Sequence, residues 1–370
     1  MNQIDACPDC LRRSRLLERL ASSIDKVCAD RPGKRTPELL ALGNEDLVAA
    51  TCRSDGDDIL EEVLEATEAS MVAEITEADC WARCRHSEDW PDGLLDGTDA
   101  PWCLIGRGDS IRLAEVTTGA SVTVVGARRA TSYGLEMARS ISRELSAAGL
   151  LVVSGMALGI DGAAHRGALE AGPTVAVLGC GVDRPYPVSH TRLYRNIVEN
   201  GLVVSEFPPG TRPWKWTFPA RNRIMAALSQ MTVVVEAARR SGSLITAEMA
   251  ADAGREVGAV PGQVTSLAAG GTNELISSGA ALIRDGRDVI DRVIGVGAPA
   301  PRPTGPNLSP EAKAVLEAVA DGFDTCEAVS IKLGMETAEV EAELARLEVA
   351  GYLACSLLGR YVRTGLGTSG

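Results

Sequence analysis

Residues 121–161 read SVTVVGARRATSYGLEMARSISRELSAAGLLVVSGMALGID. Two short apolar runs, 122–125 and 151–153, flank a segment whose apolar residues recur every three to four positions and which stops near Gly149. Runs that are apolar without alternation are typical of strands in a parallel sheet that helices cover on both faces. The stretch therefore predicts a strand–helix–strand unit.

The same pattern continues downstream of this unit. Further β-branched runs are separated by helical stretches and lie at 175–178, 202–204, 233–235, 257–260 and 281–283. Repeated strand–helix units predict an α/β fold with a doubly wound, mostly parallel sheet. In such a sheet, ligands bind beyond the carboxyl ends of the strands.

Three further regions flank the predicted sheet domain, which spans 86–296. Residues 1–85 predict an acidic helical N-terminal region, and residues 297–308 hold four prolines and two glycines, which is typical of a linker. Beyond it, helices are expected at 311–319, 325–333 and 337–350, followed by a hairpin at 352–362. This order is the outline of a winged helix, which we assign to residues 309–366.

Charge is distributed unevenly along the 370 residues, whose formal net charge is −13. Residues 1–100 carry a net charge of −12, residues 121–223 one of +5, and residues 301–370 one of −4. The basic centre is suited to an anionic partner although the whole chain is acidic. No apolar run is long enough for a bilayer and no export signal is visible, so a cytoplasmic protein is expected.

Small residues follow most of the predicted strands. They include Gly126 after the first run, Ser154 and Gly155 after the second, and the turn Ser241-Gly242-Ser243 before a helix. Free N–H groups at helix starts favour phosphate, so several such turns at one sheet edge predict an anionic ligand. The turn Gly126-Ala127-Arg128 does not fit the dinucleotide fingerprint, and no P-loop occurs, so no cofactor is expected.

Two aromatics, three cations and one amide lie within residues 215–223. Arginine and lysine bind phosphate, an aromatic ring stacks on a base, and an amide reads a base edge or a sugar. The alternative is a helix start with an exposed basic face. The residues concerned are Lys215, Phe218, Arg221, Asn222 and Arg223.

Two smaller groups of residues have both a structural and a functional interpretation. Cys7 and Cys10 could complete a zinc site with Cys80 or Cys84, but the usual second CxxC is missing, so we favour cysteines at a helix start and predict no metal. Asp161 and His165 lie one helical turn apart. No nucleophile or third ligand accompanies that pair, so we favour helix packing and predict no catalytic residue.

Segment 122–291 resembles the bacterial DNA-processing family DprA/Smf. The resemblance is carried, in family order, by Gly126-Ala127-Arg128, Ser154-Gly155-Met156-Ala157-Leu158-Gly159-Ile160-Asp161, Gly179-Cys180-Gly181-Val182-Asp183, Ser205-Glu206, Phe218-Pro219-Ala220-Arg221-Asn222-Arg223-Ile224, Ser241-Gly242-Ser243-Leu244 and Gly271-Thr272-Asn273-Glu274-Leu275-Ile276. The N-terminal third matches the family poorly, and Ala127 stands where the family commonly has serine.

The resemblance implies a Rossmann-like module that binds single-stranded DNA as a homodimer, protects it and loads the recombinase RecA, without established catalytic activity. It implies that Arg128 and Lys215 contact phosphates and that Phe218 stacks on a base. Arg221, Asn222 and Arg223 would line the same pocket. Ser154, Gly155 and the turn 241–243 would form its floor.

The main alternative is a nucleotide-binding enzyme of the nucleoside-monophosphate phosphoribohydrolase type, on a similar architecture. Its Pro-Gly-Gly-x-Gly-Thr-x-x-Glu loop is absent, because Pro261-Gly262 and Gly270-Gly271-Thr272-Asn273-Glu274 stand apart. Asp161, His165 and Glu236 would be remnants of such a site. We therefore predict a binding protein and not an enzyme.

Overall fold

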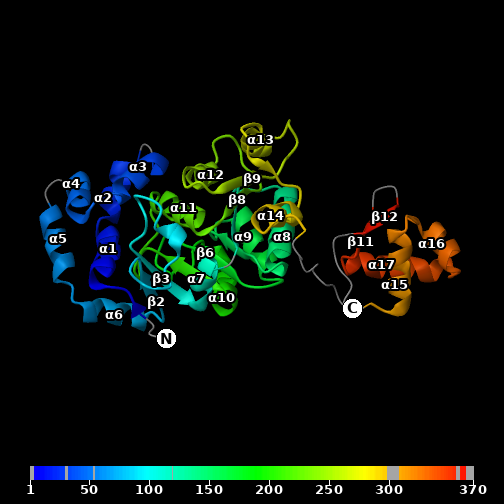
Figure 1. Cartoon of the computed structure of the whole chain (residues 1–370), viewed down its shortest axis with the longest axis horizontal. Coiled ribbons are helices and arrows are strands. Elements are labelled where there is room, and N and C mark those ends of the chain that lie inside the picture. Colours follow the sequence, from blue (N-terminus) through cyan, green and yellow to red (C-terminus); the bar gives the residue numbers. More distant parts are fainter. Residues whose placement is uncertain are drawn as a thin grey trace. The chain divides into compact units, whose positions relative to one another are not determined.

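The computed structural model divides into two compact units, Met1–Ala298 and Pro299–Gly370 (Figure 1). It describes residues 4–29, 32–52, 55–118, 120–297, 308–355 and 359–363. Most of the predicted linker, residues 298–307, lies outside these ranges. Within them, no helix combines the length and the apolar character that crossing a bilayer demands.

A ten-stranded sheet forms the centre of the first unit, in the order β1-β2-β3-β7-β6-β5-β4-β8-β9-β10 (Figure 1). All neighbours are parallel except that β3 is antiparallel to β2 and to β7. The predicted α/β class with a mostly parallel sheet is confirmed. The strands are β1 (Ile4–Asp5), β2 (Trp81–Cys84), β3 (Cys103–Gly108), β4 (Ser121–Val125), β5 (Leu151–Ser154), β6 (Thr174–Val177), β7 (Leu202–Ser205), β8 (Met231–Val234), β9 (Glu256–Ala259) and β10 (Ala281–Leu282).

The strand order reverses at the centre of the sheet. Strands β5, β6 and β7 lie on one side of β4, whereas β8, β9 and β10 lie on the other. The loops that leave β4 and its neighbours therefore diverge, which opens a crevice at the carboxyl edge of the sheet. Each apolar run expected between 122 and 283 overlaps one of the strands β4 to β10.

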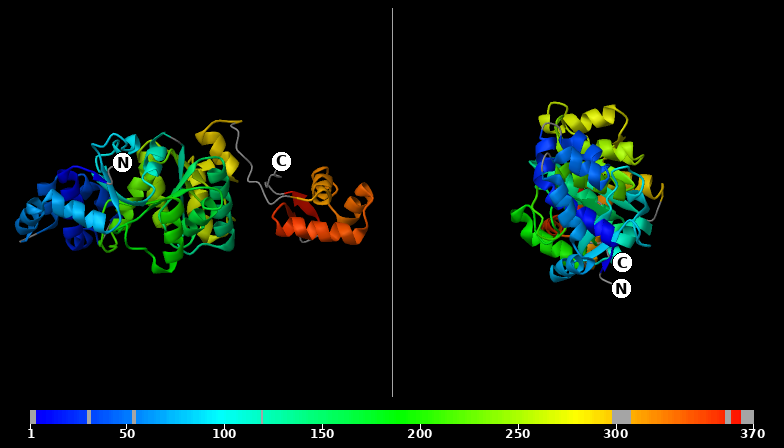
Figure 2. Two further views of the ribbon diagram at one scale, coloured as in Figure 1. Left: turned by 90° about the horizontal axis from the view of Figure 1, so that it is seen from below. Right: turned by 90° about the vertical axis from the view of Figure 1, so that its left-hand side faces the viewer.

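Helices cover both faces of the sheet (Figure 2). Val175 and Val177 pack in one buried cluster, whereas Ala176 and Leu178 pack in another, because side chains alternate across a strand. The first cluster includes α7, α11 and α12, and the second includes α1, α6 and α10. Beyond the N-terminal region, the unit contains α7 (Ile111–Thr118), α8 (Ser132–Ala147), α9 (Ile160–Ala168), α10 (Thr191–Asn200), α11 (Thr217–Leu228), α12 (Gly242–Asp252), α13 (Gly270–Ser277) and α14 (Gly286–Val293), with the 3-10 turns Asp92–Leu94, Val188–His190 and Leu267–Ala269.

The N-terminal region is helical and shares the first unit with the sheet. Its helices pack against Phe207, Trp216 and Ala220 of the sheet domain in one buried cluster. The indole Nε1 of Trp216 donates to the Ala21 carbonyl at 2.9 Å. These helices are α1 (Pro8–Arg19), α2 (Ala21–Cys28), α3 (Pro32–Leu40), α4 (Asn44–Thr51), α5 (Gly56–Glu65) and α6 (Glu68–Glu77).

The second unit has its own buried core, which includes Val315, Leu344 and Tyr352. It holds α15 (Pro310–Ala320), α16 (Cys326–Leu333) and α17 (Thr337–Val349), followed by the antiparallel pair β11 (Leu353–Cys355) and β12 (Tyr361–Arg363) (Figure 1). Residues 356–358 between the two strands, and residues 364–366 of the predicted winged helix, lie outside the described ranges.

Candidate nucleic-acid interface

A hollow of about 700 Å³ opens at the carboxyl edge of the sheet, beside the reversal of strand order. Four segments of the sequence line it: the loop after β4 and the beginnings of α9, α11 and α12. The hollow brings together nine of the sequence-predicted residues, which are Gly126, Arg128, Lys215, Phe218, Arg221, Asn222, Ser241, Gly242 and Ser243.

Helix α11 orients the aromatic residue of the site. Pro219 is the third residue of the helix, where the first-turn N–H groups have no intrahelical acceptor, so the ring is tolerated. Phe218, Asn222 and Met225 are spaced by four and three residues, so they share one helical face, and all three line the hollow. The helical period thus determines which side chains of α11 face the hollow.

Aromatic and cationic side chains meet above this face. The guanidinium of Arg128 lies over the Phe218 ring, 4.9 Å from its centroid, which is cation–π geometry. The ring of Tyr186 also lies beside Phe218. The two ring centroids are 5.6 Å apart, and the angle between the ring planes is 38°. Phe218 is half-buried and Tyr186 is 39% exposed, so both rings are accessible to a planar partner.

Cations dominate the rim of the hollow. Arg128, Arg129, Lys215 and Arg240 line it and are all exposed. The carboxylate among the lining residues is Asp161, and its Oδ2 lies 3.6 Å from Nη2 of Arg221. The charges exposed at the rim are therefore positive, as an anionic ligand requires.

The beginning of α12 supplies hydrogen-bond donors. Ser241 caps the helix and accepts from the Ser243 backbone N–H, while the two hydroxyl oxygens lie 2.8 Å apart. A side chain at Gly242 would meet nothing within 4 Å, so the backbone is open to a ligand. Helix N-termini favour anions, and this one lines the same hollow as the cations.

The structure separates Arg221, which lines the hollow as predicted, from Arg223, which does not. Arg221 is 5% exposed, donates to the carbonyls of Val177 at 2.7 Å and of Gly155, and pairs with Asp161. Burial lowers the pKa of Arg221, an effect that Asp161 opposes. It borders the hollow, but its charge is already matched inside the protein.

Arg223 does not line the hollow at all. Its Nη2 donates to Glu206 Oε2 at 2.6 Å, its Nε lies 3.7 Å from Asp99 Oδ2, and it is 6% exposed. Arg223 follows Phe218 by five residues, which places it about 140° around the helix from that ring. The helical period, read from the sequence, would have separated these two side chains.

Three small residues predicted for the site are closely packed, and of these only Gly126 also lines the hollow. Ser154 is fully buried and donates to the Val124 carbonyl at 2.7 Å. A Cβ at Gly155 would lie 1.8 Å from Nη1 of Arg221, and a Cβ at Gly126 would lie 2.6 Å from the Ile160 side chain. Gly155 therefore leaves room for the Arg221 side chain, and neither Ser154 nor Gly155 lines the hollow itself.

The candidate acid–base residues are tied to structural partners. His165 is fully buried, its Nδ1 lies 2.9 Å from Thr174 Oγ1, and burial lowers the pKa of His165 to about 3. Glu236 is 5% exposed and accepts from the backbone N–H and the hydroxyl of Thr131, at the start of α8. Both contacts hold helices against the sheet.

Sequence reasoning missed Arg129, Arg240 and Tyr186. Arg129 and Arg240 adjoin the selected residues Arg128 and Ser241, so extending each motif by one position would have included them. Tyr186 belongs to a different loop, and its contact with Phe218 depends on tertiary structure.

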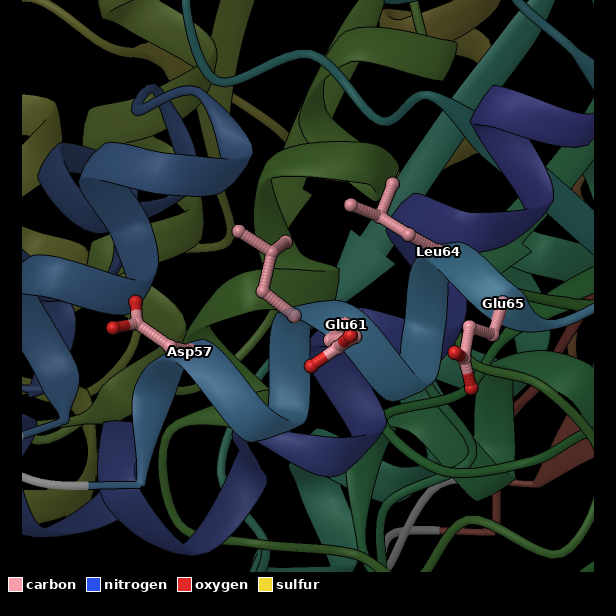
Figure 3. Close-up of a pocket in the computed structure, with 5 residues that line it drawn as sticks. Asp57, Glu61, Leu64 and Glu65 are labelled. Atoms are coloured by element: carbon pink, nitrogen blue, oxygen red, sulfur yellow. The ribbon is translucent and has the colours of Figure 1, made fainter.

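A second hollow, along α5, has the opposite electrostatic character (Figure 3). Asp57, Glu61 and Glu65 are spaced by four residues, and Leu60 and Leu64 complete its lining. A row of carboxylates repels phosphate. The acidic N-terminal helices therefore do not extend the cationic rim on this face.

The fold and the hollow define an α/β protein in which cations and an aromatic ring line a hollow at the carboxyl edge of a mostly parallel sheet. Residues 81–294 match the model of one family, DNA recombination-mediator protein A. The chain belongs to this family, and the resemblance drawn from its motifs is confirmed. The match begins at β2, so helices α1 to α6 lie outside it.

Relatives with curated names agree with this membership. The chain is 43% identical over 251 residues to the putative DNA processing protein DprA of Mycobacterium tuberculosis H37Rv, a match that covers 66% of this chain and 64% of that one. It is 37% identical over 287 residues to protein Smf of Escherichia coli K12, covering 75% of each. The chain thus spans slightly less than two thirds of the mycobacterial relative.

Solved structures show the same fold. DNA processing protein A from Streptococcus pneumoniae matches with a TM-score of 0.61 and 32% identity, over 77% of this chain and 96% of that one. DNA processing protein A from Helicobacter pylori, whose structure is described as giving insights into its single-stranded DNA binding mode, matches with a TM-score of 0.52 and 30% identity. That match covers 58% of this chain and 95% of the other.

Proposed function

We propose that this protein binds single-stranded DNA as a recombination mediator and that the hollow around Phe218 receives the strand. The observation that carries the proposal is the ring of exposed cations, Arg128, Arg129, Lys215 and Arg240, around an accessible aromatic side chain. Cations supply a salt-dependent attraction for phosphates, and an aromatic ring supplies a stacking surface.

The arrangement favours binding without regard to base sequence. Stacking of a base on Phe218 contributes about 1–3 kcal/mol, because every base has a flat face. The Arg128 guanidinium over that ring offers a second planar surface beside it. Phosphates on either side of the stacked base would meet Lys215 and the N-terminus of α12.

A single-stranded ligand is supported by the Helicobacter pylori relative, whose structure is described in terms of single-stranded DNA binding. Duplex DNA has its bases stacked on one another, so it cannot offer a base to Phe218 without unstacking. The nucleotide-hydrolase alternative is not favoured, because Glu236 and His165 are buried in structural hydrogen bonds. We propose that the protein has no catalytic activity.

The wider role follows from family membership. We propose that the protein acts in the cytoplasm, in DNA uptake and transformation or in general recombination, that it protects the strand, and that it hands the strand to the recombinase RecA. A homodimer through the Rossmann-like domain would present two hollows to one strand, which gives avidity without base reading.

The second unit has the element order of a winged helix, and we propose that it contacts protein and not DNA. Helix α17 carries Glu339, Glu341, Glu343 and Glu348, and its Arg346 is paired with Glu343. Such a helix repels the phosphates of a major groove. Val349 at its end is 91% exposed, which is suited to an apolar partner surface.

Fluorescence anisotropy of a labelled oligo-dT strand, with a duplex as comparison, tests the site. We expect salt-sensitive binding to the single strand that is lost in Lys215→Ala/Phe218→Ala. Arg195→Ala is the matched control, because Arg195 is exposed on α10 and does not line the hollow. Absence of single-strand binding at low salt would refute the proposal, and equal losses in the control would refute the site.

A further inference from the structure

Three cysteines and one histidine converge at the junction between the N-terminal helices and the sheet. Cys7 and Cys10 stand at the start of α1, Cys84 ends β2, and His86 follows two residues later. One potential ligand atom from each side chain lies within 4.8 Å of all the others. Of the two partners considered for the Cys7–Cys10 pair, the fold thus brings in Cys84, whereas Cys80 donates its thiol to the Ala78 carbonyl at 3.3 Å.

The distances within this Cys3His cluster are those of a tetrahedral metal site. The Nδ1 atom of His86 lies 3.4 Å from Sγ of Cys7, 3.6 Å from Sγ of Cys10 and 3.8 Å from Sγ of Cys84. With Zn–S bonds of about 2.3 Å and a Zn–N bond of about 2.0 Å at tetrahedral angles, the sulfur–nitrogen separation is about 3.6 Å. All three separations are close to that value.

Backbone pairing explains why the cluster forms. Strand β1 pairs with β2 in parallel register, with Asp5 opposite Arg83, so Cys7 follows β1 beside the end of β2. Cys7 is the N-cap residue of α1, and Pro8 begins that helix, which brings Cys10 back to the same side within one turn. The sequence analysis looked for a second CxxC pair. In the structure, the second pair of candidate ligands is instead Cys84 and His86, which have one residue between them.

Neighbouring polar groups orient the candidate ligands. The backbone N–H of Cys7 donates to Sγ of Cys84 at 3.4 Å, an interaction that stabilises a thiolate. Ser87 accepts from the Cys84 N–H at 3.0 Å and donates to the Asp5 carbonyl at 2.6 Å, which joins the two strands beside the cluster. These contacts are the kind of outer hydrogen bonds that fix metal ligands in place.

We propose that Cys7, Cys10, Cys84 and His86 bind one Zn²⁺ ion as a closed structural site. Three sulfur ligands and one imidazole in tetrahedral array select zinc among common divalent ions, and four protein ligands leave no position for a substrate. Cys10 and Cys84 are buried, whereas Cys7 is half-buried and His86 is exposed, so the ion has an entry path from the surface. None of the four residues lines the proposed DNA-binding hollow.

The ion would tie together segments that are 77 residues apart in the sequence. The loop closed in this way contains all six N-terminal helices, and closure of a long loop reduces the entropy of the unfolded chain. Helix α2 lies in that loop, and Asp25 of α2 accepts from the Lys215 backbone N–H at 3.1 Å. The zinc site therefore stabilises the region that supports Lys215.

Metal content of the full chain, purified without a polyhistidine tag, tests the proposal. After addition of Zn²⁺ and removal of loosely bound metal with a competing chelator, we expect one zinc ion per wild-type chain and almost none in Cys84→Ser or His86→Asn. His86→Asn is the safer variant for folding because His86 is exposed. Cys80→Ser is the control, since Cys80 lies on the same segment but outside the cluster, and it should keep the wild-type content.

Two further readouts separate zinc from other uses of the cysteines. Co²⁺ in place of Zn²⁺ should give the visible absorption of a tetrahedral thiolate complex in wild type and in Cys80→Ser, and not in the two ligand variants. Chelation should lower the melting temperature of the wild type and leave that of His86→Asn unchanged. A Cys7–Cys10 disulfide found by mass analysis under reducing purification, or a wild-type zinc content equal to that of His86→Asn, would overturn the proposal.

Discussion

Replacement of Arg223 by alanine distinguishes a structural cation from a DNA-binding one. Arg223 lies in the run after Phe218, and the family resemblance predicts that it lines the DNA site. The structure instead pairs it with Glu206 in the interior. Glu206 is 3% exposed. The substitution therefore leaves a buried carboxylate without its closest cation, at 2.6 Å in the native protein.

The expected cost comes from the uncompensated carboxylate. Loss of one partner of a buried ion pair destabilises a protein by about 3–5 kcal/mol. Arg13, also buried, interacts electrostatically with Glu206 and remains in the variant, so the lower end, about 3 kcal/mol, is expected. The double variant Arg223→Met/Glu206→Gln removes both partners of the pair, so it should lose less stability than Arg223→Ala, although Arg13 and Asp99 each lose an electrostatic partner.

Urea unfolding followed by tryptophan fluorescence measures this cost, because all five tryptophans lie in the first unit. The dependence of single-strand affinity on salt is measured in parallel. We expect Arg223→Ala to lose stability and to keep the wild-type salt slope. An unfolding free energy within about 0.5 kcal/mol of the wild type, together with a slope reduced by about 0.7, would refute the structural role and restore Arg223 as a phosphate ligand.

The remaining predictions concern the hollow, the packing beneath it, acid stability and the second unit. Arg128→Ala should weaken binding of all sequences alike and reduce the salt slope by about 0.7, as one lost phosphate contact does on a single strand; dependence of the loss on base identity would contradict this. Gly155→Ala should lower stability by about 1–3 kcal/mol in thermal unfolding, because its Cβ would overlap the guanidinium beneath the hollow. Burial lowers the folded-state pKa of His165 to about 3. The contribution of neutral His165 to stability is therefore complete above about pH 6.5 and is lost as the pH falls towards 3, by about 1.4 kcal/mol per pH unit. In His165→Gln, the decrease of the unfolding free energy with falling pH should be shallower by that slope. Deletion of Pro299–Gly370 should leave single-strand affinity within about twofold in the anisotropy assay, since its third helix is acidic; a large loss would assign a DNA contact to the second unit.

The central strands were predictable from the sequence because their local residue pattern is that of a strand covered on both faces. Runs such as 122–125 are apolar and β-branched on both faces, which only a doubly covered strand requires. The edge strand β1 and its neighbour β2 lack this signal. β1 has two residues, and β2 contains Arg83, whose buried guanidinium is bonded to Asp89 at 3.0 Å and to the Ala82 carbonyl at 3.0 Å. Such compensation depends on tertiary contacts and cannot be read locally.

The site was predictable where the chain itself positions a residue. Arg128 lies in the loop after β4, and Ser241 caps the helix that follows β8, so the parallel sheet brings both to one edge. Within α11 the residue types alone were misleading, because Arg223 and Phe218 point in different directions from one helix. The sequence suggested Cys7 and Cys10 with Cys80 or Cys84, but the choice of Cys84 and the addition of His86 depend on the pairing of β1 with β2.

The contact between the N-terminal helices and the sheet domain shows that a domain defined by sequence similarity differs from a domain defined by its buried core. The family match begins at Trp81, but Leu16 and Leu17 upstream of it are fully buried in a cluster with Phe207 and Trp216. A shortened chain starting at the family boundary would expose those two aromatic side chains to water and would be prone to self-association. The segment that the family model matches is thus smaller than the segment whose side chains share this buried core.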